Sequence, residues 1–240
     1  MIKNYIAFDL ETTGLSIEDD YIIEIGAVKV RDGKVVERFM EFVKPSKPIT
    51  SIVTSITGIS NDMVEHARCV QEVISDFLIF CEQDILVGHN ILFDYKFVKR
   101  EANAIGKSFE KKAIDTLKIA RCTLKTLTSK SLESLCSYYQ IVNSNAHRAY
   151  YDALTTAKIY HILAHEFEDT HPELFCAKQL SYRPKKIQPC TKRQLEFLAA
   201  LCAHHHIPFP KNAHAFTRSE ASKKIDEIIT IYGRMIQEKL

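Results

Sequence analysis

The order of β-rich and helical segments is the feature that most restricts how this chain can fold. Short runs with strand-like composition or continuous apolar character are predicted as strands: 4–10, 21–30, 34–43, 84–90 and 113–116. Arg31-Asp32-Gly33 joins the second and third runs and is typical of a hairpin turn. Because the later strands alternate with helical segments, we expect an α/β fold with a central mixed sheet flanked by helices.

The remaining segments predict a main domain followed by a small helical one. Helical spacing of apolar residues is present at 70–81, 91–104, 116–121, 131–139 and 148–166. The segment 45–60, with two prolines and many Ser and Thr, predicts an ordered loop. Capping-box patterns at Thr191–Gln194 and Thr217–Glu220 predict two further helices. We therefore expect three parts: a domain at 1–168, a proline-containing basic linker at 169–190, and a small α-helical module at 191–240.

Composition points to a soluble cytoplasmic protein. The seven cysteines are scattered and form no CxxC pair, which favours reduced thiols over a disulfide framework. The N-terminus has no signal-segment pattern, and no apolar run approaches the roughly 18 residues that span a bilayer, so no membrane partner is expected. The formal net charge of +2 does not by itself indicate a nucleic-acid partner.

Two acids lie within the first predicted strand. Side chains two residues apart on a strand point to the same face, so Asp9 and Glu11 should lie about 6–7 Å apart along it. Two carboxylates on one face of an apolar strand should repel each other and resist burial. Solvation at a strand end is the commoner explanation for such a pair.

Three more polar residues stand out. Asp94 falls in the first turn of the helix predicted after a short buried strand, and His147 precedes Asp152 in an H-x-x-x-x-D spacing. Taken singly, each has a commoner explanation: an acid favoured by the helix dipole, a surface histidine, or a chance spacing.

Taken together, the ordered motifs "FDLET", "HNILFD" and "HRAYYDA" resemble those of the DEDDh 3′→5′ exonucleases. The segments "TSITGISNDMV" and "IDTLKIAR" add to the resemblance, which covers residues 4–166. The last motif, with a Tyr before its Asp, is most similar to that of the proofreading exonuclease domain of C-family bacterial polymerases, the DNA polymerase III type. The resemblance implies an RNase H-like fold and an enzyme that releases nucleoside 5′-monophosphates.

The resemblance also assigns roles to the five residues. Asp9, Glu11, Asp94 and Asp152 would hold two Mg²⁺ or Mn²⁺ ions, since hard divalent cations prefer carboxylate oxygen. Asp9 would bridge both ions, and Glu11 would bind one ion and hold the 3′ end. Two ions about 3.5–4 Å apart can stabilise an in-line displacement at phosphorus. His147 would take the proton of the attacking water, because an imidazole is receptive near neutral pH.

Five further residues are predicted to bind substrate: Thr12, Thr13, Leu15, His89 and Asn90. The first three would border the terminal nucleotide, with ordinary turn residues as the alternative. His89 and Asn90 belong to a family motif, and would either touch substrate or brace the strand-to-helix junction. Asp115 resembles a family position that we interpret as structural.

The expected substrate is the 3′ end of single-stranded DNA, because the motif context is polymerase-like. Trimming of RNA ends is the alternative within the enzyme class. The alternative outside it is an inactive adaptor that binds nucleic-acid ends, which predicts losses among the four acids, and none is seen. A DNA polymerase or a sliding clamp is a further candidate partner. "QLSYRP" (179–184) is similar to the start of a clamp-binding peptide, but Arg183 replaces its final apolar residue.

The C-terminal region leaves three interpretations open. The basic run 180–193 would either follow a phosphate backbone or be a solvated linker. Cys202 and His206 are four residues apart and would lie on one helix face, where zinc is conceivable but lacks a convincing second pair of ligands. The region resembles a small helical tail found on bacterial DNA-associated proteins, and we predict an accessory docking or nucleic-acid-contact element.

Overall fold

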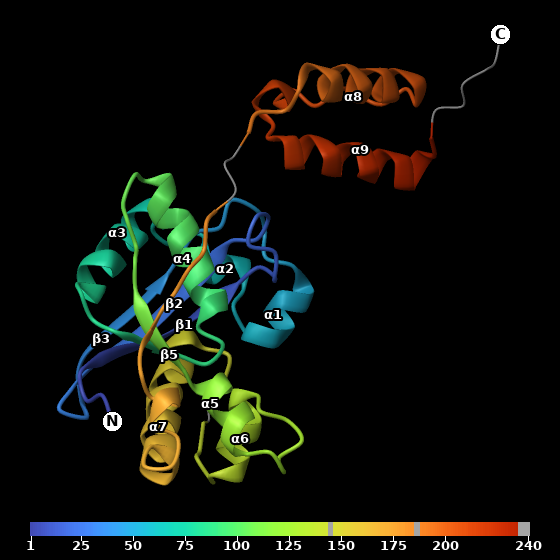
Figure 1. The fold of residues 1–240 in the computed structure, drawn as a ribbon. Helices are drawn as coiled ribbons and strands as arrows, with labels where there is room; N and C mark the ends of the chain where they lie inside the picture. Colours follow the sequence, from blue (N-terminus) through green and yellow to red (C-terminus); the bar gives the residue numbers. More distant parts are fainter. Residues whose placement is uncertain (144–145, 185–187, 235–240) are drawn as a thin grey trace. The chain divides into compact units, whose positions relative to one another are not determined.

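The computed structural model describes residues 1–143, 146–184 and 188–234. Its contacts divide the chain into two compact units, Met1–Pro184 and Lys185–Leu240, which are described separately below (Figure 1). Among the described helices, none has both the length and the apolar character needed to cross a membrane.

The first unit is built on a mixed sheet, as predicted. Its strands are β1 Tyr5–Thr12, β2 Ile22–Arg31, β3 Lys34–Phe42, β4 Leu86–Gly88, β5 Lys112–Asp115 and β6 Lys178–Gln179. They lie in the order β3-β2-β1-β4-β5-β6. The β1–β4 and β4–β5 pairs are parallel and the other pairs are antiparallel. The predicted hairpin between β2 and β3 is confirmed, since Asp32 and Gly33 both adopt positive φ angles, of 49° and 77°.

Helices cover both faces of this sheet. They are α1 Ser51–Thr57, α2 Asn61–Val64, α3 Val70–Cys81, α4 Leu92–Ala104, α5 Thr116–Thr123, α6 Leu132–Tyr138 and α7 Ala149–Phe167. A short 3₁₀ turn follows at Pro172–Leu174. The five helices that apolar spacing predicted are all present, with ends that agree to within about two residues.

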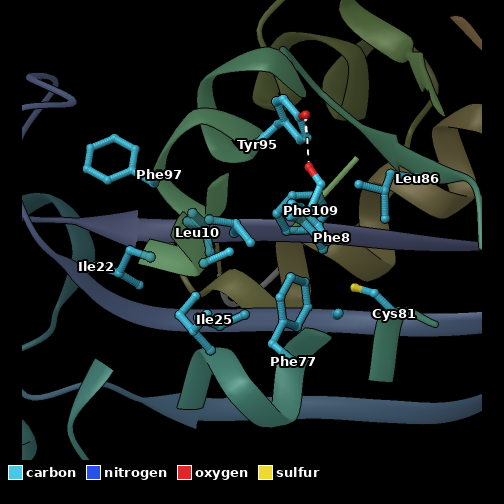
Figure 2. Packing of buried hydrophobic residues seen from close by; sticks show 14 of the residues in the cluster. Phe8, Leu10, Ile22, Ile25, Phe77, Cys81, Leu86, Tyr95, Phe97 and Phe109 are labelled. Atoms are coloured by element: carbon cyan, nitrogen blue, oxygen red, sulfur yellow. Dashed lines mark hydrogen bonds between the residues drawn. The ribbon is translucent and has the colours of Figure 1, made fainter. Parts of the chain in front are cut away.

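The alternation of β1 divides the core into two layers. Phe8 and Leu10 point into a cluster that is shared with α3 and α4, whereas Tyr5 and Ala7 point into one shared with α5 and α7. Burying one such large apolar side chain stabilises the fold by about 2 kcal/mol. Figure 2 shows the first layer, where Phe8 packs on Phe77 with ring centroids 5.3 Å apart.

A buried hydrogen bond ties α4 to this layer. The hydroxyl of Tyr95 donates to the backbone oxygen of Phe109 at 3.0 Å, and the Tyr95 ring is fully buried beside the Phe109 ring (Figure 2). A buried hydroxyl without such a partner would be costly. The bond holds the first turn of α4 in place, and Asp94 belongs to that turn.

A glycine in β2 lets α7 approach the sheet closely. A Cβ atom at Gly26 would lie 2.0 Å from the backbone nitrogen of Tyr150 and 2.1 Å from the backbone carbon of Ala149. Gly26 is the partner of Asp9 in the β1–β2 ladder. The first turn of α7 therefore crosses the sheet next to the acid-bearing end of β1.

The prediction of a loop at 45–60 is wrong. Helix α1 forms there, with Thr50 as N-cap accepting a bond from the Val53 amide and with Gly58 as a left-handed C-cap. Ile49 and Ile59 on either side are buried in a small cluster with Val64. The β-branched residues have low helix propensity, but the two caps and the burial of the flanking residues compensate.

The predicted linker 169–190 also differs from the structure in its first part. Strand β6 pairs with β5, and the Leu180 amide donates to the Lys111 oxygen at 2.9 Å. Leu180 and Tyr182 pack against the first core layer. Prolines and basic residues suggested a solvated segment, but the exposed edge of β5 gives this stretch a partner, and the first unit extends to Pro184.

The second unit contains the two predicted helices, α8 Lys192–His204 and α9 Arg218–Tyr232, with a 3₁₀ turn at Ala213–Ala215. Both capping boxes are present, one at the start of each helix. Among its described residues, Leu198, Leu201, Cys202, Ala213 and Ile228 are buried together in one hydrophobic cluster.

Candidate active site

Asp9 and Glu11 lie at the carboxyl end of β1. They continue the Tyr5 and Ala7 face of the strand, so both are directed toward the layer that contains α7. The cavity at this edge has a volume of about 740 Å³. All five residues of the predicted catalytic set line it together: Asp9, Glu11, Asp94, His147 and Asp152. The structure therefore gathers the predicted catalytic set, drawn from three separate elements and one loop.

Asp94 reaches this cavity from the opposite layer. Because β1 and β4 are parallel neighbours, their carboxyl ends meet at one edge of the sheet, and α4 begins just after β4. The Asp94 side chain is 4% exposed, and its Oδ1 accepts a bond from the Leu10 amide at 3.2 Å. This bond fixes the carboxylate beside the strand that carries Asp9 and Glu11.

Asp152 is held by two donors from the segment before α7. Asn143 Nδ2 donates to Oδ1 at 2.8 Å, and the His147 backbone amide donates to Oδ2 at 2.9 Å. His147 has a positive φ of 62°, an uncommon conformation for a non-glycine residue that gives the chain its sharp entry into α7. Ligand atoms of Glu11, His147 and Asp152 lie within 4.8 Å of one another, as the coordination of a cation requires.

The electrostatics of the cavity favour a divalent cation. Burial raises the pKa of Asp9, and the nearby carboxylates of Asp94, Glu11 and Asp152 raise it further. Burial, followed by the charges of Asp152 and Glu24, raises the pKa of Glu11 to about 8. Burial also raises the pKa of Asp94 to about 8. Carboxylates that resist ionisation in the free protein, and that offer hard oxygen donors, fit bound divalent metal ions.

An ion pair behind the site was not predicted from the sequence. Glu24, 3% exposed, accepts a bond from Arg148 Nη2 at 2.9 Å and another from the Ala149 amide at 3.0 Å. The Arg148 guanidinium also lies 5.2 Å from the centre of the Phe42 ring. The pair joins β2 to the start of α7. The only sign of this pair in the sequence was Glu24 itself, a single acid inside the apolar run 21–30.

His89 and Asn90 line the cavity, and both also make contacts that brace the strand-to-helix junction. His89 Nδ1 bonds to Thr116 Oγ1 at 2.9 Å, and Nε2 bonds to the Lys130 oxygen at 2.8 Å. Burial lowers the pKa of His89. The Asn90 amide donates to Asp115 Oδ1 at 3.0 Å, and the same carboxylate caps α5. Asp115 thus has the structural position we expected.

The other predicted substrate residues lie outside the cavity lining. Thr12 Oγ1 donates to the Gly14 oxygen at 2.7 Å, and Thr13 Oγ1 donates to Asp20 Oδ1 at 3.2 Å. Both hydroxyls therefore hold the loop after β1. Leu15 is 84% exposed, so its side chain is available to a ligand.

Helix α6 and the chain after it form a wall of the cavity that the sequence did not indicate. The lining residues there include Glu133, Cys136, Ser137, Gln140 and Asn143. No motif marks them, because their place in the site depends on how α6 packs against α7.

The pair Cys202 and His206 does not form a metal site in the described part of the second unit. Cys202 is 2% exposed and belongs to the core of that unit, while His206 follows the end of α8 with a positive φ. Across the described residues, the cluster of three His, Cys or acidic ligands that fits a cation is Glu11, His147 and Asp152.

Comparison with known proteins identifies the family. The family model described as Exonuclease matches residues 6–160. The chain belongs to this exonuclease family. The predicted resemblance, the α/β fold of RNase H type and the assignment as a nuclease are thereby confirmed.

Curated relatives at about 40% identity are DNA polymerases III of the PolC type. The chain is 41% identical over 156 residues to a PolC-type DNA polymerase III of Caldanaerobacter subterraneus subsp. tengcongensis, an alignment that covers 65% of this chain and 11% of that protein. The chain thus spans about a tenth of the length of such relatives.

Solved structures share the fold. Exonuclease X in complex with 5′-overhanging duplex DNA is 26% identical, with a TM-score of 0.57, and the match covers 71% of this chain and 96% of that one. The zinc-bound complex of E. coli exonuclease I with single-stranded DNA has a TM-score of 0.63 at 19% identity, over 73% of this chain and 42% of that one.

Proposed function

We propose that this exonuclease hydrolyses single-stranded DNA from its 3′ end and releases nucleoside 5′-monophosphates. The observation that carries the proposal is the convergence of Asp9, Glu11, Asp94 and Asp152, together with His147, on one cavity. The charges of Asp94 and Asp152 raise the pKa values of both Asp9 and Glu11, so the four carboxylates would be a costly arrangement without bound cations.

The four carboxylates would hold two divalent cations, Mg²⁺ or Mn²⁺. When bound, such ions supply positive charge that stabilises the phosphoryl transition state and the leaving oxygen. The chain itself orients the carboxylates: Leu10 holds Asp94, and Asn143 with the His147 amide holds Asp152. Burial of Glu11 and Asp94 keeps bulk water from screening these charges.

His147 is the residue we assign as proton acceptor. Its side chain is exposed at the cavity, next to Glu11 and Asp152, while its backbone amide is held by Asp152. In the reaction, a water oxygen bonds to the terminal phosphorus, its proton passes to the imidazole, and the bond from phosphorus to the 3′ oxygen of the preceding nucleotide breaks. The released 3′ oxygen takes a proton from solvent, which leaves a 5′-monophosphate.

DNA is favoured over RNA by the comparisons. The relative at 41% identity is a DNA polymerase, and the structure at 26% identity contains DNA.

A DNA polymerase or a sliding clamp stays a predicted partner. The clamp-like stretch 179–184 begins in β6, and Gln179 Nε2 donates to the Lys111 oxygen at 3.1 Å. Leu180 and Tyr182 pack on the core, so this stretch is engaged within the first unit.

Digestion of matched DNA and RNA strands tests the proposal. With Mg²⁺ or Mn²⁺ we expect a single strand labelled at its 5′ end to be shortened stepwise from its 3′ end, with release of mononucleotides. The digestion should be faster on DNA than on RNA. Chelation should stop the reaction. Asp94→Asn should abolish it, whereas the exposed control Asp62→Asn should not. Failure to release mononucleotides with either metal, or faster digestion of RNA, would overturn the proposed activity or substrate respectively.

The role of His147 has its own test. His147→Ala should lower kcat by roughly 10²-fold, the typical contribution of a positioned general base. His66→Ala, which changes an exposed histidine on the segment before α3, serves as control. A near-wild-type rate in His147→Ala would remove this residue from the mechanism while leaving the carboxylate site intact.

A further inference from the structure

The second unit presents an exposed face that combines apolar and cationic side chains. Arg193 and Phe197 are four residues apart on α8 and lie one turn from each other. Arg218 and Ile225 are seven residues apart on α9 and share one face of that helix. These four residues are called the α8–α9 face below. A pocket of about 440 Å³ opens there, lined by Thr191, Arg193, Gln194, Glu196, Phe197 and Ile225.

The cations and the aromatic ring of this face are exposed and do not stabilise the described part of the unit. Phe197 is 41% exposed, although it lies on a helix with a well-formed core side. Arg193 and Arg218 are exposed, and their guanidinium groups form no ion pair or hydrogen bond with another described residue. Glu196, the acid that lines the pocket, is paired with Lys192 at 3.7 Å.

Gln194 does not add hydrogen-bonding specificity to the pocket. Its Nε2 donates to the Arg218 oxygen at 2.9 Å and to Ser222 Oγ at 2.9 Å, and its Oε1 accepts from the Thr191 amide. The amide is therefore used to join α8 to α9. A ligand of this pocket would be recognised by stacking and charge rather than by a pattern of hydrogen bonds.

Charge along the chain favours a polyanion as that ligand. Residues 185–240 contain ten Lys and Arg against five Asp and Glu, whereas residues 1–184 contain 22 against 25. The basic excess is thus confined to the second unit. The stretch 174–195, which leads into α8, has six Lys and Arg and no acid. Such an asymmetry between two parts of one chain is typical of nucleic-acid contact.

We propose that the α8–α9 face binds single-stranded nucleic acid, with a base stacked on Phe197 and with phosphates contacted by Arg193 and Arg218. Aromatic platforms flanked by cations bind single strands in this way with little sequence preference. The catalytic unit carries net negative charge and a cluster of carboxylates, so it attracts a strand weakly. The second unit supplies the attraction and raises the local concentration of strand ends.

Binding is measured without hydrolysis, on the full chain with chelator present. The readout is fluorescence anisotropy of a labelled oligothymidylate of about 20 nucleotides at several salt concentrations. Phe197→Ala should weaken binding by about tenfold, the usual effect of removing one stacking platform. The control is Ile231→Ala, which removes a side chain that is 64% exposed on α9.

A charge reversal tests the cation in the same assay. Arg193→Glu should weaken binding and reduce the salt dependence, and a glutamate in the first turn of α8 is favoured by the helix dipole, so the helix should persist. Lys211→Glu changes the net charge equally at an exposed site away from both helices. If both charge reversals weakened binding equally, the effect would come from net charge and not from this face, and the proposed site would be overturned.

This inference rests on the proposed function, because a nucleic-acid ligand is expected of an exonuclease. Kinetic measurements distinguish a failure of the inference from a failure of the proposed function. Phe197→Ala should raise KM for a long strand several-fold and leave kcat, and the rate on a trinucleotide, unchanged. Unaltered oligonucleotide binding in both face variants would overturn the inference even if hydrolysis is normal. Absent hydrolysis with intact, Phe197-dependent binding would overturn the proposed activity alone. Displacement of the oligonucleotide by an equimolar acidic peptide that carries a phenylalanine would show a protein partner instead, and would overturn the inference.

Discussion

Glu24 lies directly opposite Glu11 in the β1–β2 ladder, on the strand that supports the acid cluster. Like charges in such positions are destabilising, and the charge of Glu24 raises the pKa of Glu11. Arg148 offsets this repulsion, because it pairs with Glu24 and its charge lowers the pKa of Glu11. The start of α7 is thus held to the sheet by the same residue that moderates the charge of the site.

Loss of this pairing should cost stability. Arg148→Met leaves the buried Glu24 carboxylate without its cation, and we expect the free energy of unfolding to fall by about 2 kcal/mol. The double variant Glu24→Gln/Arg148→Met should recover part of that loss. Urea unfolding of the two single variants and the double variant measures the coupling. Strictly additive effects would show that the pair contributes no interaction energy.

The close contact at Gly26 should make this position intolerant of any side chain. In Gly26→Ala the new methyl group would overlap the backbone of Ala149 and Tyr150, so α7 must shift away from β2. We expect the unfolding free energy to fall by about 3 kcal/mol and exonuclease activity to be lost, because Asp152 moves with α7. Gly106→Ala is a control in open space, with strain from its positive φ alone. Wild-type activity in Gly26→Ala would contradict this account of how α7 is placed.

Asn143 should matter to metal binding although no motif marks it. Its amide is one of two donors that orient Asp152, and the loss of such a partner usually weakens metal affinity by about 10- to 100-fold. Asn143→Ala should therefore require more Mn²⁺ for half-maximal thermal stabilisation and for half-maximal rate, with kcat at saturating metal largely retained. An unchanged metal requirement would assign Asn143 to packing alone.

Without metal, the stability of the protein should fall as the pH rises. The pKa values of Glu11 and Asp94 are raised to about 8 from ordinary values of 4.5 and 3.8, so the folded state binds more protons than the unfolded state between those limits. The stability that these two groups contribute is therefore greatest at a pH below their ordinary pKa values, and it is lost as the pH rises toward 8. We expect Tm in chelator to fall between about pH 5 and pH 8, and saturating Mg²⁺ to restore it at pH 8.

The variant Glu11→Gln provides the comparison for this titration. It removes one of the groups whose pKa is raised in the folded state, so its Tm in chelator should depend less on pH than that of the wild type, and Mg²⁺ should restore less. Asp62→Asn, which changes an exposed acid, should behave as the wild type. A pH dependence that is identical in Glu11→Gln would show that other groups control the stability in this range.

What the sequence by itself determined was local. The strand that contains Asp9 and Glu11, the first turn that contains Asp94, and the capping boxes of α8 and α9 follow from alternation, helical spacing and cap chemistry, which act over a few residues. The acid motifs also carried enough information to predict the family, since their order along the chain is retained.

Only the tertiary structure decided which distant residues meet. The pairing of Glu24 with Arg148, 124 positions later, and the support of Asp152 by Asn143 depend on how α7 crosses the sheet. Strand β6 formed where proline and charge suggested a linker, because an open strand edge offered its amide and carbonyl groups partners. Burial and hydrogen bonding between remote segments outweigh local propensity, and they have no signature in a single stretch of sequence.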